Sequence, residues 1–231
     1  MQKNIRNSYL YIFLLIGAVM LSSNAFARPV LLELFTSEGC SACPAGERKV
    51  AELNKRDDFF ALSFHVDYWD KKGWVDKFAK REFTDRQMAY MSQFGSSKLY
   101  TPQAVVDGVN DTYASWGWRV KMLAHGAKKK QVAIPIELNG NKVHLEAVNL
   151  PKLVDIWYVT YNDYEESNVK AGANAGEVLG SVNVVHTLNK LALWDGKAVT
   201  INLPKLEGTG EKTAIFIQEQ HQGKVLGLYH Q

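Results

Sequence analysis

The sequence has few of the residues that define several large classes of site. Only two of its 231 residues are cysteine, and no His-x-x-x-His pair accompanies them, which argues against a zinc site of the usual spacing. It has no Gly-x-Gly-x-x-Gly and no Gly-Lys-Ser/Thr segment, so a phosphate-binding loop is not indicated. It also has no Gly-x-Ser-x-Gly, so serine hydrolase chemistry has no positive support.

Long hydrophobic runs and charge of one sign are also scarce. The only long apolar run covers Tyr9 to Leu21, 13 residues against the ~20 that span a bilayer. Basic residues precede it and Ala25-Phe26-Ala27 follows it, which predicts a secretory signal peptide over 1–27, with an uncleaved anchor as the alternative. We therefore expect a periplasmic or secreted protein, free of the membrane after cleavage.

The charge balance points to no charged partner. The formal charge of +3 contains Lys3 and Arg6, and losing both with the signal leaves 3 − 2 = +1. Nothing in this balance suggests binding to nucleic acid.

The two cysteines, Cys40 and Cys43, lie two residues apart in Cys40-Ser41-Ala42-Cys43-Pro44. An apolar strand is predicted over 30–35, and a helical pattern begins at Pro44. Cys40 is therefore expected near a helix N-terminus, where the helix dipole favours a thiolate and lowers the thiol pKa. Cys43 would then be the resolving thiol of a redox pair.

Two other interpretations of the pair remain open. A structural disulfide closing so short a loop would stabilise by only about 2 kcal/mol in the loop-entropy model. Alternatively, Cys40, Cys43 and His65 could bind copper(I), which prefers soft thiolate ligands.

Residues 28–130 alternate between strand and helix patterns, which predicts an α/β layer. A second buried strand is expected over 59–66. Residues 74–94 carry apolar residues at helical spacing, as one helix or as two that are broken near 82–84. A strand over 104–106, a short hairpin strand near Thr112 and a helix over about 116–130 are expected to follow. Residues 131–231 show strand patterns alone, which predicts a small antiparallel sandwich or barrel. The strands are expected at 132–138, 143–148, 155–161, 182–193, 199–203, 213–220 and 225–229.

In combination, these features resemble the thioredoxin fold. The resemblance rests on the strand predicted over 30–35, the Cys-x-x-Cys at a helix start, and a later Thr101-Pro102 that leads into a strand. The resemblance implies that Pro102 is cis and lies against the cysteines, and that Thr101 presents its backbone to an extended substrate.

A narrower resemblance covers nearly the whole mature chain. The segments 33–40, 65–70, 100–103 and 194–196 are similar to the secreted bacterial thioredoxin-like proteins catalogued as domain of unknown function 1223. This family supplies no established substrate. The chain departs from ordinary thioredoxins in having Gly39 rather than Trp before Cys40, and in a long segment between Asp67 and Pro102 that predicts a helical insertion.

Other polar and aromatic residues are secondary candidates. Glu33, expected in a buried strand, is predicted to relay the proton of Cys43, against the alternative of a paired structural acid. His65 and Asp67 are expected on one face of their strand, where they could orient each other or assist the sulfur, although a strand histidine is more often a core residue. Trp69 could form an aromatic wall for a substrate, or pack in the core.

We therefore expect an exported thiol–disulfide oxidoreductase with a thioredoxin-like domain (28–130) and a sandwich-like β domain (131–231). Its catalytic residues would be Cys40, Cys43 and Glu33, with Thr101, Pro102, Trp69 and Asp67 binding substrate. The expected partner is a protein or small molecule that carries a disulfide or thiol, and no cofactor is needed. The alternatives are copper handling and a binding module with a structural disulfide.

Overall fold

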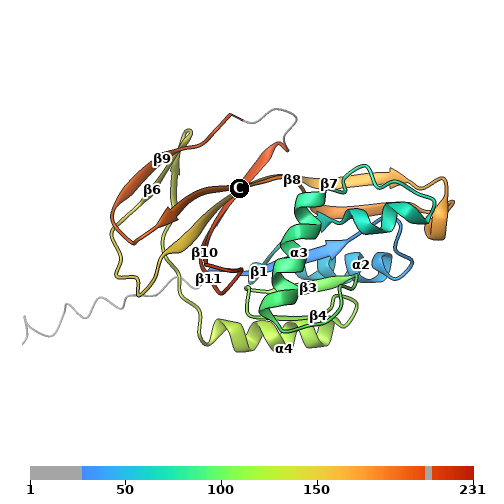
Figure 1. The fold of residues 1–231 in the computed structure, drawn as a ribbon, viewed down its shortest axis with the longest axis horizontal. Helices are drawn as coiled ribbons and strands as arrows, with labels where there is room; N and C mark the ends of the chain where they lie inside the picture. Colours follow the sequence, from blue (N-terminus) through green and yellow to red (C-terminus); the bar gives the residue numbers. More distant parts are fainter. Residues whose placement is uncertain (1–27, 206–209) are drawn as a thin grey trace, which may run out of the picture.

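The computed structural model describes residues 28–205 and 210–231, and the signal peptide predicted over 1–27 lies outside them. Most strands belong to one eight-stranded sheet with the order β11-β10-β7-β8-β2-β1-β3-β4 (Figure 1). A second sheet has three strands in the order β5-β6-β9. Among the described residues, no helix is long and apolar enough to cross a membrane.

The first half of the chain builds the part of the sheet that carries the cysteines. Strands β1 and β2 are parallel and fully buried, while β3 and β4 continue the sheet in antiparallel pairs. The elements are β1 (Val30–Thr36), α2 (Cys43–Asn54), β2 (Phe59–His65), the 3-10 helix η1 (Asp67–Lys72), α3 (Arg81–Gln93), β3 (Gln103–Val106), β4 (Asn110–Tyr113) and α4 (Gly117–Lys128).

The buried strands are apolar on both faces because helices cover both. Leu32 and Leu34 of β1 pack with Val50 and Leu53 of α2 and with the buried face of α4. On the other face, Phe35 packs with residues of α3. Continuous apolar strands of this kind are typical of a sheet layered between helices.

Within residues 131–205 and 210–231, the regular elements are strands apart from one short 3-10 helix. These elements are β5 (Glu137–Asn139), β6 (Lys142–Leu145), β7 (Val154–Asn168), η2 (Gly172–Asn174), β8 (Val178–Trp194), β9 (Val199–Asn202), β10 (Lys212–Glu219) and β11 (Val225–His230). The three-stranded sheet packs over one end of β7, β10 and β11 around a third core that includes Val143, Ile156 and Ile215. This arrangement is sandwich-like, but one of its two layers is the large sheet.

The predicted domain boundary near residue 130 lies between α4 and β5. Strands from both sides of it share the large sheet, because β8 pairs in parallel with β2 through Ser63 and Val184. The division of the chain into two folding units stays a prediction.

Two predicted elements are wrong in extent. The helical spacing over 74–94 yields one helix that begins at Arg81, because Gly73 turns the chain at φ +93° and Trp74 and Asp76 bond to Glu38 instead. The strand predicted over 132–138 is reduced to β5, because this segment crosses from α4 to the small sheet.

Candidate functional site

The two cysteines form a disulfide at the N-terminus of α2. Their Cα atoms are 5.4 Å apart, and the two residues are almost fully buried. The turn before the helix is closed by backbone bonds from Cys40 to Ser37 and from Cys43 to Cys40, each of 3.1 Å. Pro44 stands in the first helical turn, where its missing N–H costs nothing, and no acidic residue there opposes a thiolate.

The Thr101–Pro102 segment lies against the cysteines, as the resemblance implied. Its peptide bond is cis, and the carbonyl oxygen of Thr101 is 3.9 Å from Sγ of Cys40. Helix α2 approaches Pro102 closely because residue 46 is glycine: a Cβ there would lie 2.6 Å from the proline ring.

Trp69 belongs to the same site. Its indole N–H donates to the hydroxyl of Thr101 at 2.9 Å, and its Cβ would lie 3.2 Å from a Cβ at Gly39. Trp69 therefore fixes the Thr101–Pro102 segment from the side of η1, and its contact with a substrate stays a prediction.

The structure corrects the prediction for Glu33. Its carboxylate accepts a hydrogen bond from Nη2 of Arg86 at 2.9 Å and another from the hydroxyl of Tyr90, both on α3. Along β1, Glu33 shares a face with Leu31 and Phe35, opposite to the face that α2 covers. Glu33 is thus a paired structural acid that does not face Cys43.

A different buried acid lies on the cysteine side of the sheet. Glu47 follows Cys43 by four residues on α2, which puts both side chains on one helix face. The hydroxyl of Thr36 donates to its Oε1 at 2.6 Å. Burial raises the pKa of Glu47, although His65 and the Thr36 hydroxyl act in the opposite direction.

His65 pairs with Asp76 rather than with Asp67. Its Nδ1 is 2.7 Å from Oδ2 of Asp76, and the side chains of both are buried. Burial alone would lower the pKa of His65, but the charges of Asp76 and Glu47 outweigh it and raise that pKa. Burial would raise the pKa of Asp76, yet His65 brings it below its ordinary value.

Asp67 lies beyond the strand, because β2 ends at His65 and η1 begins at Asp67. The predicted shared strand face for His65 and Asp67 is therefore wrong. Asp67 accepts a hydrogen bond from the hydroxyl of Thr84 at 2.6 Å and so fixes η1 to α3.

A copper site is not assembled in this disulfide form. Within residues 28–205 and 210–231, no three His, Cys, Asp or Glu side chains are grouped to hold a metal ion. The predicted set of Cys40, Cys43 and His65 is thus not gathered as ligands.

Sequence reasoning missed Glu47, Asp76 and Asn174, whose side-chain amide donates to the backbone oxygens of Glu38 and Cys40. Glu47 had a detectable signal, since its spacing from Cys43 is one helical turn. Asp76 and Asn174 had none, because each reaches the site from a distant part of the chain.

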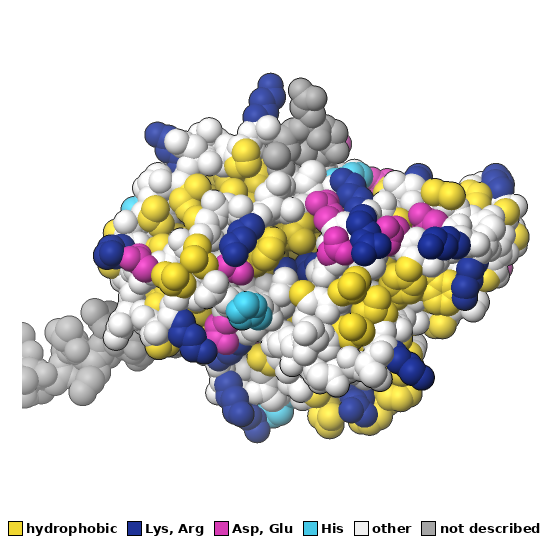
Figure 2. Space-filling view, viewed as in Figure 1, with side chains coloured by type: hydrophobic (Ala, Val, Ile, Leu, Met, Phe, Trp, Pro, Cys, Tyr) yellow, Lys and Arg dark blue, Asp and Glu magenta, His cyan; other side chains and the backbone are white. Residues whose placement is uncertain are grey.

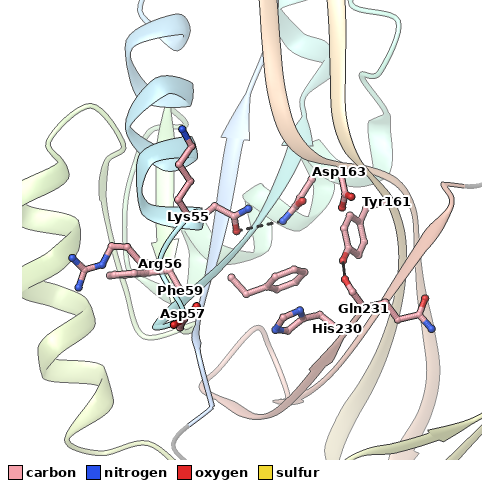
Figure 3. A pocket seen from close by; sticks show the side chains of 11 residues that line it. Lys55, Arg56, Asp57, Phe59, Tyr161, Asp163, His230 and Gln231 are labelled. Carbon is pink, nitrogen blue, oxygen red and sulfur yellow. Dashed lines mark hydrogen bonds between the residues drawn. The ribbon is translucent and has the colours of Figure 1, made fainter.

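A hollow of about 240 Å³ lies at the other end of α2 (Figure 3). Its floor is aromatic: the ring of His230 stacks on Phe60 with centroids 4.1 Å apart, and Tyr161 donates to the backbone oxygen of Gln231. Neither cysteine lines it, so we assign it no part in thiol chemistry.

The surface near α4 is partly apolar. Figure 2 shows hydrophobic side chains along the lower edge of the molecule, where Figure 1 places α4. Trp118 and Met122 of this helix are more than half exposed. This surface is distinct from the buried disulfide.

Comparisons with known proteins give a family and a fold. A family model described as "Protein of unknown function (DUF1223)" matches residues 31–218. A crystal structure of a protein from Agrobacterium tumefaciens is 25% identical, with a TM-score of 0.75, over 88% of this chain and 94% of that chain. HBP35 of Porphyromonas gingivalis is 16% identical, with a TM-score of 0.57, over 89% of this chain and 75% of that chain, which bears on the fold alone. No curated protein matches the sequence.

Proposed function

Because the chain belongs to the DUF1223 family, whose description names no activity, we propose its function from the site: it is an exported thiol–disulfide oxidoreductase that uses Cys40 and Cys43. The observation that carries the proposal is the combination of a Cys-x-x-Cys disulfide at a helix N-terminus with a cis Thr101–Pro102 segment against it.

The topology of the first half supports a thioredoxin-like domain. Parallel β1 and β2 are joined through α2, the antiparallel pair β3 and β4 follows, and α4 closes the layer on the same face as α2. In this arrangement the cysteines follow the carboxyl end of β1, the edge at which sites of α/β sheets gather.

The proposed reaction needs no group beyond the two sulfurs. In the reductive direction, the Cys40 thiolate attacks one sulfur of a substrate disulfide and releases the first substrate thiolate. The Cys43 thiolate then attacks Sγ of Cys40 in the mixed disulfide, which forms the Cys40–Cys43 bond and releases the second substrate thiol. Two electrons pass to the substrate, and the reverse sequence oxidises a dithiol.

The surroundings suit these steps. The helix N-terminus favours the thiolate of Cys40, which is the attacking species. Glu47, held on the Cys43 side of α2 with a raised pKa, is suited to accept the proton that Cys43 loses and to return it in reverse. The Thr101 carbonyl beside Cys40 is placed to accept a hydrogen bond from a bound substrate backbone.

Two single variants test the assignment. Cys43→Ser should accumulate a mixed disulfide between Cys40 and a substrate, seen as a mass increase that dithiothreitol reverses. Cys40→Ser should form no such adduct and should lose turnover of a model disulfide. A Cys40→Ser protein that reduces the disulfide at the wild-type rate would exclude this function.

A further inference from the structure

The connection between β7 and β8, residues 169–177, contacts the backbone of the turn that carries Cys40; we call it the β7–β8 tip. Its backbone is closed on itself by bonds from Val169 N to Glu177 O at 3.0 Å and from Gly176 N to Val169 O at 2.9 Å. In Figure 1 the hairpin extends to the end of the sheet where α2 begins. The tip is thus an ordered turn rather than a loose loop.

Asn174 in the tip binds the backbone of the cysteine turn. Its Nδ2 donates to the carbonyl oxygen of Glu38 at 2.7 Å and to that of Cys40 at 3.0 Å. Both N–H groups of this amide are therefore used, and the residue is only 7% exposed. Because the contacted groups are main chain, the contact fixes the turn that carries Cys40.

A second set of contacts holds the tip from the side of residues 74–80, which we call the inserted segment. Gly172 approaches Trp74 so closely that a Cβ would lie 3.1 Å from the Cβ of Trp74. The indole N–H of Trp74 donates to Oε2 of Glu38 at 2.6 Å, and Lys77 donates to the backbone oxygen of Glu166 at 3.0 Å. The tip, the inserted segment and the cysteine turn are thereby joined.

The cysteine in this turn, Cys40, is almost fully enclosed. Cys40 is only 1% exposed, although Ser41 and Ala42 beside it are exposed. Disulfide exchange requires the sulfur of a partner to reach the Cys40 sulfur itself. Because Asn174 holds the backbone of the turn that carries Cys40, we expect a folded protein to reach the sulfur only when that contact is broken, whereas a small reagent needs only a small opening.

We propose that the β7–β8 tip sets the specificity of the site by admitting low-molecular-weight thiols and disulfides and excluding disulfides on folded proteins, with Asn174 as the positioning residue. This inference rests on the proposed function. In each turnover the Cys40/Cys43 dithiol gives two electrons to a small disulfide, which leaves as two thiols, and the Cys40–Cys43 bond forms.

The test compares two substrates in single turnover. The full mature protein is reduced with dithiothreitol, desalted, and mixed with oxidised glutathione or with insulin, a folded protein that contains disulfides. The variants are Asn174→Ala and Asn174→Asp, which keeps the size but loses both donors. Lys170→Ala, at an exposed position of the tip, is the matched control.

Wild type should reduce oxidised glutathione and react far more slowly with insulin. Either Asn174 variant should speed the insulin reaction roughly tenfold and the glutathione reaction by less than about twofold, since hydrogen bonds that hold a closed state are lost. Lys170→Ala should match wild type. Comparable wild-type rates on both substrates, or equal changes in both rates in the variants, would overturn the proposal.

A measurement on wild type alone covers the case in which the variants do not fold. The reduced protein is alkylated at Cys40 with iodoacetamide and with a maleimide carried on a large polyethylene glycol, each rate divided by that on a short cysteine peptide. The large reagent should be slowed roughly tenfold more than the small one, as a sterically closed site requires. Equal slowing would refute the inference.

Different results would contradict the proposed function and the role of the tip. If wild type neither reduces these disulfides nor, as the Cys40–Cys43 disulfide, oxidises a dithiol, the proposed function is wrong, and the alkylation ratio still decides whether access to Cys40 is restricted by size. If wild type reduces both equally well, the function stands and the tip is not a specificity element.

Discussion

At the scale of single residues, two buried acids differ in their partners, and the partners separate a structural role from a chemical one. Glu33 and Glu47 are both buried, but Glu33 bonds to an arginine whereas Glu47 has a threonine hydroxyl and a neighbouring histidine. The sequence indicated that Glu33 is buried, since it lies in an apolar strand. It could not indicate that this acid has a cationic partner from α3, because strand and helix are about 50 residues apart.

Replacing Glu47 should separate activity from stability. In Glu47→Gln we expect disulfide exchange to slow by roughly tenfold to a hundredfold, since a general base is lost. Because the pKa of Glu47 is raised in the folded protein, ionisation of its carboxyl lowers the stability of the fold as pH rises above about 4.3. The variant, which cannot ionise there, should be at least as stable as wild type at pH 8.

Stopped-flow exchange rates and urea unfolding at pH 8 test this expectation for Glu47→Gln. Glu52→Gln, at an exposed position of the same helix, is the control: it loses only an exposed ion pair with Lys49, so it should leave exchange unchanged and cost less than about 1 kcal/mol. Unchanged exchange in Glu47→Gln would remove Glu47 from the mechanism.

The His65–Asp76 pair should give a pH-dependent stability. Because the pKa of His65 is raised in the folded protein, the protonated imidazole adds to the free energy of unfolding. This contribution is complete below about pH 6.5 and is lost as pH rises through the folded pKa. Glu47, whose pKa is also raised, acts in the same direction from lower pH. Asp76→Asn should therefore cost about 2 kcal/mol at pH 6 and less at pH 9.

Urea unfolding of Asp76→Asn and wild type between pH 6 and 9 measures this difference. The exposed His125→Asn variant is the control and should follow wild type. A loss in Asp76→Asn that grows with pH would show that the imidazolium–carboxylate pair is not what stabilises the fold there.

At the scale of elements, local pattern predicted most strands and helices, and distant contacts account for the errors. The pattern placed α2, β2, β3, β4 and α4 within a few residues, because their apolar spacing is regular. It failed over 74–80, where Trp74 and Asp76 bond to Glu38, nearly 40 residues away. Nor could it show how far β7 and β8 extend, since the outer end of β7 is largely polar and that of β8 contains Gly180.

The approach of α2 to Pro102 gives a prediction for this packing. Gly46→Ala places a Cβ 2.6 Å from the ring atoms of Pro102, so helix or proline must shift. We expect a loss of about 1 to 3 kcal/mol in the free energy of unfolding, as in other overpacked sites, together with slower exchange.

The control is Gly126→Ala in α4, where a Cβ meets nothing within 4 Å. This change should stabilise by up to about 1 kcal/mol through helix propensity and leave exchange unchanged. Urea unfolding and exchange rates compare the two, and a Gly46→Ala protein that gains stability as Gly126→Ala does would contradict the close contact.

At the scale of the whole molecule, buried polar groups join the two halves of the chain. Arg86 of α3 bonds to Glu33 of β1 and also to Oε1 of Gln218 in β10 at 3.0 Å. Arg28 bonds to Asp107 and to the backbone oxygen of Val225. The sequence predicted each half separately, but the change from mixed to all-β pattern near residue 130 does not show that strands of both enter one sheet.

Breaking the Arg86 contacts should destabilise the whole molecule. Arg86→Ala leaves Glu33 buried without its cation, which costs about 3 to 5 kcal/mol in comparable cases. Arg81→Ala, which removes an exposed ion pair with Asp85 on the same helix, should cost less than about 1 kcal/mol. Chemical unfolding of both variants checks the contrast, and equal losses would show that the buried pair has no special role.

The measurement that bears most directly on the proposed function is the reduction potential of the Cys40–Cys43 pair. The protein without residues 1–27 is equilibrated in dithiothreitol redox buffers, and its free thiols are counted by alkylation and mass. A redox-active pair should titrate at a potential above about −300 mV, whereas a lower value is typical of a structural disulfide and would contradict the account.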